Sequence, residues 1–126
     1  MIKPGEMAIG NIQLESGSKI LFSEPGRETI IHLNGSTIWR SKTLNDNLEL
    51  VAKGFKIIQH SSETMIVEGE WAGSIFAPNA DLILGQSSKT LYGRFLGNNI
   101  TVHQYATIYN VNFNPTIQHQ IVMYEE

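Results

Sequence analysis

The sequence contains no cysteine, which excludes disulfide bonds, thiolate metal sites and cysteine nucleophiles. Charge is also scarce, at 17% of 126 residues against roughly 25% in a typical soluble domain. Lys and Arg number 9 and Asp and Glu 12, so the net charge is -3 and we expect no nucleic-acid partner. No window approaches the roughly 20 apolar residues of a transmembrane helix, so we expect no membrane insertion.

Sequence motifs for catalysis and for metal binding are missing as well. There is no GxxxxGK[ST], GxGxxG or GxSxG string, so neither a phosphate-binding loop nor a nucleophile elbow is predicted. The histidines form no HxH or HxxxH pair, although His32 and His103 occupy comparable places that stacking would bring together. Glu68 and Glu70, two residues apart beside Trp71, are compatible with calcium or sugar binding, but this pattern is more typical of a solvated strand face. We therefore expect no enzyme, no catalytic residue, no metal site and no cofactor.

What the chain does contain is a repeat. Its hydrophobic content of 41% suffices for the core of one domain over residues 1–126, and short alternating apolar pairs recur along it. The pairs begin at nearly equal intervals, at Ile12, Ile31, Leu48, Met65, Leu82 and Ile100. A second apolar position follows each pair at a nearly constant offset, at Ile20, Ile38, Ile57, Ile75, Leu91 and Ile108.

The spacing of two within each pair is the period of a β-strand, and Gly, Asn and Ser between the pairs predict turns. A β-sandwich also has short strands, but it gives no reason for one apolar register to return six times. Stacked coils of a solenoid require it. We therefore predict an all-β, single-stranded parallel β-helix (β-solenoid) of about six short coils, with a β-sandwich or jelly roll as the alternative. Residues 115–126 are predicted to be a capping or linking strand.

The stretch from residue 73 to residue 109 is more specific than the rest. It reads GSIFAPNADLILG over 73–85, LYGRF over 91–95, NITV over 99–102 and ATIY over 106–109. These segments resemble the bacterial choice-of-anchor A and related adhesive β-helical domain family. The resemblance implies a right-handed β-helix from an exported protein, located extracellularly or at the cell surface. Independently of it, Pro78 restricts the backbone and predicts a corner between two strands, with the small Ala77 and Ala80 on its crowded side.

Aromatic and amide side chains give the best signal for binding. Aromatic faces and neutral amides hold sugars and peptides without strong charge. The alternative is that several of these rings fill the solenoid interior. The candidate ligand-binding residues are Trp39, Trp71, Tyr92, Tyr105, Tyr109 and Asn110.

Three functions remain open at this point. The first, which the resemblance implies, is a non-catalytic bacterial cell-surface or secreted module acting in adhesion or surface attachment, with a surface polymer, polysaccharide or host protein as its ligand. The second is a carbohydrate-binding module of a larger extracellular enzyme. The third is a structural stalk unit that self-associates through its coil ends.

Overall fold

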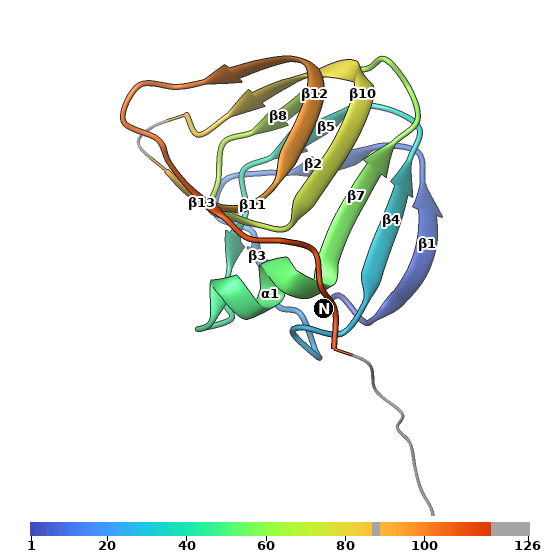
Figure 1. Cartoon of the computed structure of the whole chain (residues 1–126), viewed down its shortest axis with the longest axis vertical. Helices are drawn as coiled ribbons and strands as arrows, with labels where there is room; N and C mark the ends of the chain where they lie inside the picture. The colour runs from blue at the N-terminus through green and yellow to red at the C-terminus, as the bar shows by residue number, and fades with distance from the viewer. Residues whose placement is uncertain (87–88, 117–126) are drawn as a thin grey trace, which may run out of the picture.

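The computed structural model describes residues 1–86 and 89–116, which form a parallel β-solenoid of about five turns (Figure 1). The predicted solenoid is confirmed, with about five turns in place of six, and every ladder pairing among the described residues is parallel. The elements are β1 (Gly5–Ile9), β2 (Ile12–Leu14), β3 (Lys19–Ile20), β4 (Thr29–Leu33), β5 (Thr37–Trp39), β6 (Lys42–Thr43), α1 (Leu48–Gly54), β7 (Phe55–Gln59), β8 (Met65–Val67), β9 (Trp71–Ala72), β10 (Ser74–Leu84), β11 (Thr90–Gly93), β12 (Phe95–Val102) and β13 (Thr107–Asn110).

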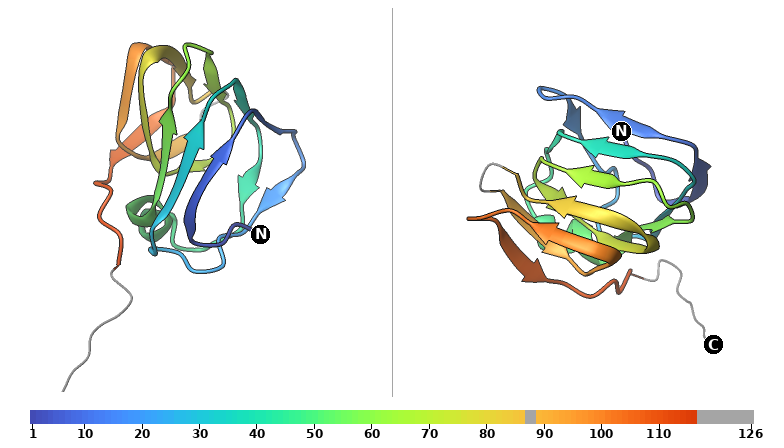
Figure 2. Two further views of the ribbon diagram at one scale, coloured as in Figure 1. Left: turned by 90° about the vertical axis from the view of Figure 1, so that its right-hand side faces the viewer. Right: turned by 90° about the horizontal axis from the view of Figure 1, so that it is seen from above.

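Strands line three faces of the solenoid, and the two further views in Figure 2 show the turns stacked from first to last. The first ladder joins β1, β4, β7 and the first halves of β10 and β12. The second joins β2, β5, β8 and the second halves of β10 and β12. On the third face, β9, β11 and β13 form one sheet and β3 and β6 another. Stacking in register aligns side chains of successive turns in columns, each of which faces inward or outward.

The inward columns form the core. The last two members of one inward column are Leu82 and Ile100, and those of another are Leu84 and Val102. The members of both columns in the middle turns are buried. Four aromatic rings pack together in the interior, with centroid separations of 4.7 to 6.3 Å between the contacting pairs. These rings belong to Phe22, Trp39, Phe55 and Trp71.

The predicted even period holds only for the later turns. Met65, Leu82 and Ile100 pair in register, at nearly equal steps along the sequence. The earlier turns are longer, because the partner of Ile12 is Thr37 and the partner of Thr37 is Met65. Loops and a helix in the first turns account for the extra residues. About five turns of unequal length therefore replace the six even ones.

The prediction of a strand at Leu48 and Leu50 is wrong, because both residues lie in helix α1. The Asn47 side chain accepts a hydrogen bond from the Leu50 N–H at 3.1 Å and so caps the helix N-terminus. Asn47, one of the Asn residues between apolar pairs that predict a turn, therefore starts the helix. No helix in the described part of the chain is long and apolar enough to cross a bilayer.

The predicted corner at Pro78 lies within one strand, β10, as an irregularity. The pairing of β10 with β12 shifts register between Ala77 and Asp81, and the strand then continues into the second ladder. Ala77 and Ala80 are both fully buried, as predicted for small residues on the crowded side. The corner thus divides β10 between two faces of the solenoid.

Residues 111–116, here called the axial segment, leave the last turn and run back along the solenoid (Figure 1). Its N–H groups bond to carbonyl oxygens of earlier turns: Asn114 to Lys53 at 2.8 Å and Thr116 to Gly26 at 2.7 Å. The predicted capping or linking strand over 115–126 lies outside the described residues from 117 onward. The axial segment fastens the last turn to the loop before β4.

Candidate functional site

Two of the six candidate ligand-binding residues face the interior. Trp39 is 2% exposed and Trp71 1%, and their rings contact each other edge to face at 4.7 Å. Trp39 stands in the inward column between Leu14 and Val67. The prediction that these tryptophans form an exposed platform is therefore wrong. An indole buries more apolar surface than any aliphatic side chain, so both rings contribute to the core.

Tyr92 and Tyr109 face outward and lie side by side. They pair in register between β11 and β13, and their rings stack with centroids 5.1 Å apart and planes 19° from parallel. Tyr109 is 52% exposed, whereas Tyr92 is half-buried beneath it. We call this pair the tyrosine ladder. It presents one open aromatic face at the end of a rigid sheet. Asn110 is exposed as well, but it pairs with the buried Gly93 and so lies on the other side of the strand.

Tyr105 is the most exposed aromatic residue of the described chain, at 75%. It lies shortly before Tyr109, in the turn that the Ala106 N–H closes on the His103 carbonyl at 3.1 Å. Its φ of 73° is a left-handed conformation, which costs a residue with a Cβ roughly 1–2 kcal/mol. Such strain in an exposed aromatic residue is typical of functional sites.

A groove, here called the outer groove, lies beyond the corner that follows the tyrosine ladder. Arg94, which follows Tyr92 closely in the chain, donates from Nη1 to the Asn112 Oδ1 at 3.0 Å and thereby ties the start of β12 to the axial segment. The volume of the groove is about 520 Å³, within the range of small-ligand sites. It is lined by Lys56, Ser74, Ile75, Phe76, Arg94, Phe95, Leu96, Asn112 and Phe113.

The outer groove combines positive charge with apolar walls. Lys56 places its Nζ 5.3 Å from the centre of the Phe113 ring, and Phe76 and Leu96 are 42% and 46% exposed. Ser74 is only 7% exposed, and its hydroxyl has no hydrogen-bond partner among the described residues. A buried hydroxyl without a partner is costly, and because this oxygen is inaccessible to solvent it does not itself face a ligand in the groove. This chemistry suits a ligand with an apolar face and polar or anionic substituents.

Sequence reasoning missed the residues of the outer groove. The register aligns Lys56 with Ser74, and the Ile75 N–H bonds to the Arg94 carbonyl at 2.9 Å, so the three outward positions are neighbours in successive turns. In the sequence each is separated from the next by a whole turn of the solenoid, without a shared motif. Knowledge of the pairing register was the only signal that would have found them.

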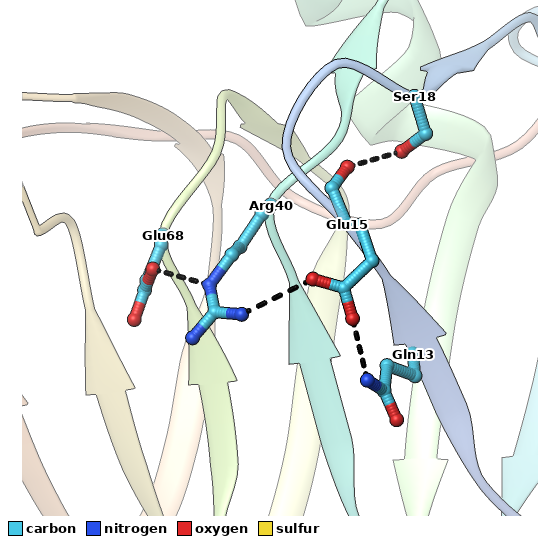
Figure 3. A network of polar contacts seen from close by, with 5 residues as sticks. All are labelled: Gln13, Glu15, Ser18, Arg40 and Glu68. Carbon is cyan, nitrogen blue, oxygen red and sulfur yellow. Dashed lines mark hydrogen bonds and ion pairs between the residues drawn. The ribbon is translucent and has the colours of Figure 1, made fainter.

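The carboxylates near Trp71 have a structural role in part. Arg40 donates from Nε to Glu68 Oε1 at 2.7 Å and lies 3.4 Å from Glu15 through Nη1, so three successive turns are linked by an acid–base–acid column (Figure 3). The hydrogen bond to Glu68, followed by that carboxylate's charge, raises the pKa of Arg40 above its usual value. Glu70 instead lines a polar groove with Lys42.

The histidines pair differently from the prediction. His32 stacks on His60, with ring centroids 5.1 Å apart and Nδ1 of His32 2.9 Å from Nε2 of His60, while its own Nε2 contacts Glu6. His103 lies in another column, after Val102. Within residues 1–86 and 89–116, no group of three or more His, Asp or Glu side chains is arranged to hold a metal ion.

Comparison with protein-family models, with curated proteins and with solved structures finds no match to this chain.

Proposed function

We propose that this chain is a non-catalytic module of a bacterial cell-surface or secreted protein that adheres to a polysaccharide through the tyrosine ladder. The observation that carries the proposal is the outward stack of Tyr92 and Tyr109, which offers a flat aromatic face fixed by a parallel sheet. Pyranose rings pack their C–H faces on such a surface. Adhesion needs no reacting group there.

The outer groove extends this surface around the corner of the solenoid. Arg94 and Asn112, which are bonded to each other, follow the two strands of the tyrosine ladder and line the groove. A polymer held on the tyrosine ladder would reach Lys56 with its next residues. The same surface would serve a carbohydrate-binding module of a larger extracellular enzyme. That alternative differs only in requiring a catalytic domain elsewhere in the parent protein.

The test is binding of the purified chain to an array of immobilised glycans, with collagen included as a protein ligand. We expect retention on one class of polysaccharide, and a loss of about tenfold or more in affinity for Tyr109→Ala, equivalent to about 1.4 kcal/mol. Tyr109→Phe keeps the ring and should bind within about twofold of the parent. Leu44→Ala, which shortens an exposed apolar side chain outside this surface, is the matched control.

Two results would overturn the proposal. One is that no immobilised glycan retains the parent chain at high micromolar concentration. The other is that Tyr92→Ala and Tyr109→Ala bind as the Leu44→Ala control does, with circular dichroism spectra showing that all three are folded. Retention by collagen alone would favour a protein ligand over a polysaccharide and would also reject the proposal as stated.

A further inference from the structure

The last turn of the solenoid exposes apolar side chains at positions whose equivalents in the preceding turn are buried. Ile100, Val102 and Ile108 continue the inward columns of Leu82, Leu84 and Leu91. The three earlier residues are fully buried, whereas the three in the last turn are 40% to 45% exposed. Among the described residues, β12 and β13 pair with a strand on one side only. This end of the solenoid therefore presents unpaired strand edges around an apolar centre.

The first turn presents the opposite end in a similar state. Its inward residues Met7, Ile9, Ile12 and Leu14 are only half-buried, although Ile31 and Leu33 in the second turn are buried. They surround an apolar groove of about 570 Å³ that reaches down to Trp39. Strands β1 and β2 likewise pair on one side only in the described structure.

The two ends match when the register of the solenoid is continued from one copy of the chain to the next. The column that ends in Phe95 begins with Met7, the column that ends in Ile100 begins with Ile12, and the column that ends in Val102 begins with Leu14. Placing the first turn of one copy on the last turn of another thus sets apolar residues on apolar residues. It also keeps all strands parallel.

The outward columns add charge complementarity. The column that ends in Arg94 begins with Glu6, so a second copy would bring the Glu6 carboxylate to the Arg94 guanidinium. The column that contains Glu15 and Arg40 ends in His103, which would meet Glu15 of the second copy.

We infer that this chain self-associates head to tail, with the first turn of one copy stacked on the last turn of the next. Strands β12 and β1 would continue the first ladder, and β12 and β2 the second. Such a contact is heterologous and leaves a free end on each outer copy, so it extends into linear oligomers. The inference concerns the solenoid ends and goes beyond the ligand proposed for the tyrosine ladder, although Arg94 and Tyr109 belong to the same last turn.

Disulfide crosslinking tests the register directly, since the chain has no cysteine of its own. Gln13 and Thr101 occupy the same outward column, pairing with Ile38 and Ile83 respectively, and both are exposed. In the stack their Cα atoms would lie about 5 Å apart, within the range that a disulfide spans. A tagged Gln13→Cys chain and an untagged Thr101→Cys chain are mixed and oxidised with diamide.

We expect the mixed dimer to exceed either homodimer at least tenfold, and a chain with both cysteines to form a series of dimers, trimers and longer products. The control pair is Glu63→Cys with Thr101→Cys, because Glu63 is exposed in the loop before β8, away from both ends. A yield of mixed dimer equal to that of the control pair, or a preference for Gln13→Cys homodimers, would overturn the inference.

Sedimentation of the unmodified chain supplies a second, independent readout. Its average mass should rise with concentration, and Val102→Lys should raise the concentration of half-association about tenfold or more by placing a charge in the contact. Thr64→Lys, on an exposed loop position, should leave association unchanged. A parent chain that stays monomeric up to millimolar concentration would reject head-to-tail stacking, and circular dichroism would show that the variants are folded.

Discussion

Replacing Gly93 by alanine should destabilise this solenoid far more than the loss of a typical glycine, because two turns touch there through their backbones. Gly93 has a φ of +148°, and a Cβ added to it would lie 1.9 Å from the Gly73 carbonyl oxygen in the preceding turn. The atoms nearest to this Cβ all belong to the backbone of Gly73 and Ser74, so no side chain can move aside and the two turns themselves must separate. Gly17, with φ at +89° and no atom within 4 Å of an added Cβ, is the matched control.

The magnitude follows from the contacts that the separation breaks. A positive φ costs alanine roughly 1–2 kcal/mol at either glycine. At Gly93, two backbone hydrogen bonds also lie at the contact: Gly73 N–H to Tyr92 O at 2.8 Å and Val111 N–H to Gly93 O at 3.3 Å. Each contributes about 1 kcal/mol net. We therefore expect a loss of about 3–4 kcal/mol for Gly93→Ala and about 1–2 kcal/mol for Gly17→Ala.

Urea unfolding followed by the fluorescence of the buried Trp39 and Trp71 measures both losses. The Gly93 variant should also weaken glycan binding, since Tyr92 precedes the displaced residue and would lose its stacking on Tyr109. If Gly93→Ala unfolds at the same urea concentration as Gly17→Ala, the backbone contact does not limit the spacing of the turns, and the reasoning is refuted.

Two further predictions concern local conformation. Tyr105→Gly should raise the free energy of unfolding by up to about 1 kcal/mol by removing the strain of its φ of 73°, and it should lower glycan affinity if the exposed ring contributes to binding; Tyr105→Ala, which keeps the strain, should not stabilise the fold. Asn47→Ala should cost about 1 kcal/mol through loss of the α1 cap, whereas Asn47→Ser should retain most of the stability in the same urea assay.

The solenoid was predictable because its late turns repeat at a nearly constant length. Met65, Leu82 and Ile100 lie in one ladder, as their even spacing predicts. The same even spacing includes Ile31, which belongs to the first ladder, and Leu48, which belongs to a helix. Apolar alternation marks an inward-facing strand but does not say which ladder the strand joins. The ladder of each strand becomes known only from how turns of unequal length pair with one another.

Only part of the candidate site could be predicted from the sequence, because alternation in short strands does not always tell an inward side chain from an outward one. An aromatic side chain in a strand faces the core or the solvent according to its position in the alternation, and short strands give few neighbours from which to judge it. Trp71 belongs to a strand of two residues, β9, where alternation carries almost no information. Tyr92 lies between the buried Leu91 and Gly93, so its outward direction follows from the alternation once β11 is known to be a strand. The outer groove could not be predicted from the sequence, because only the pairing register brings its residues together.

Head-to-tail stacking and glycan adhesion make a joint prediction that neither makes alone. Turns spaced about 4.8 Å apart would repeat the tyrosine ladder roughly every 24 Å along a stack of five-turn copies, so a long polymer would contact several ladders at once. Multivalent contact raises avidity by about 10²–10⁴ without any new contact. Val102→Lys should therefore weaken binding to an immobilised polysaccharide while leaving affinity for a short oligosaccharide unchanged, because it alters only the end of the solenoid. Tyr109→Ala should weaken both, because it removes the exposed ring itself. Equal losses on the two ligands for Val102→Lys would mean that stacking does not contribute to adhesion.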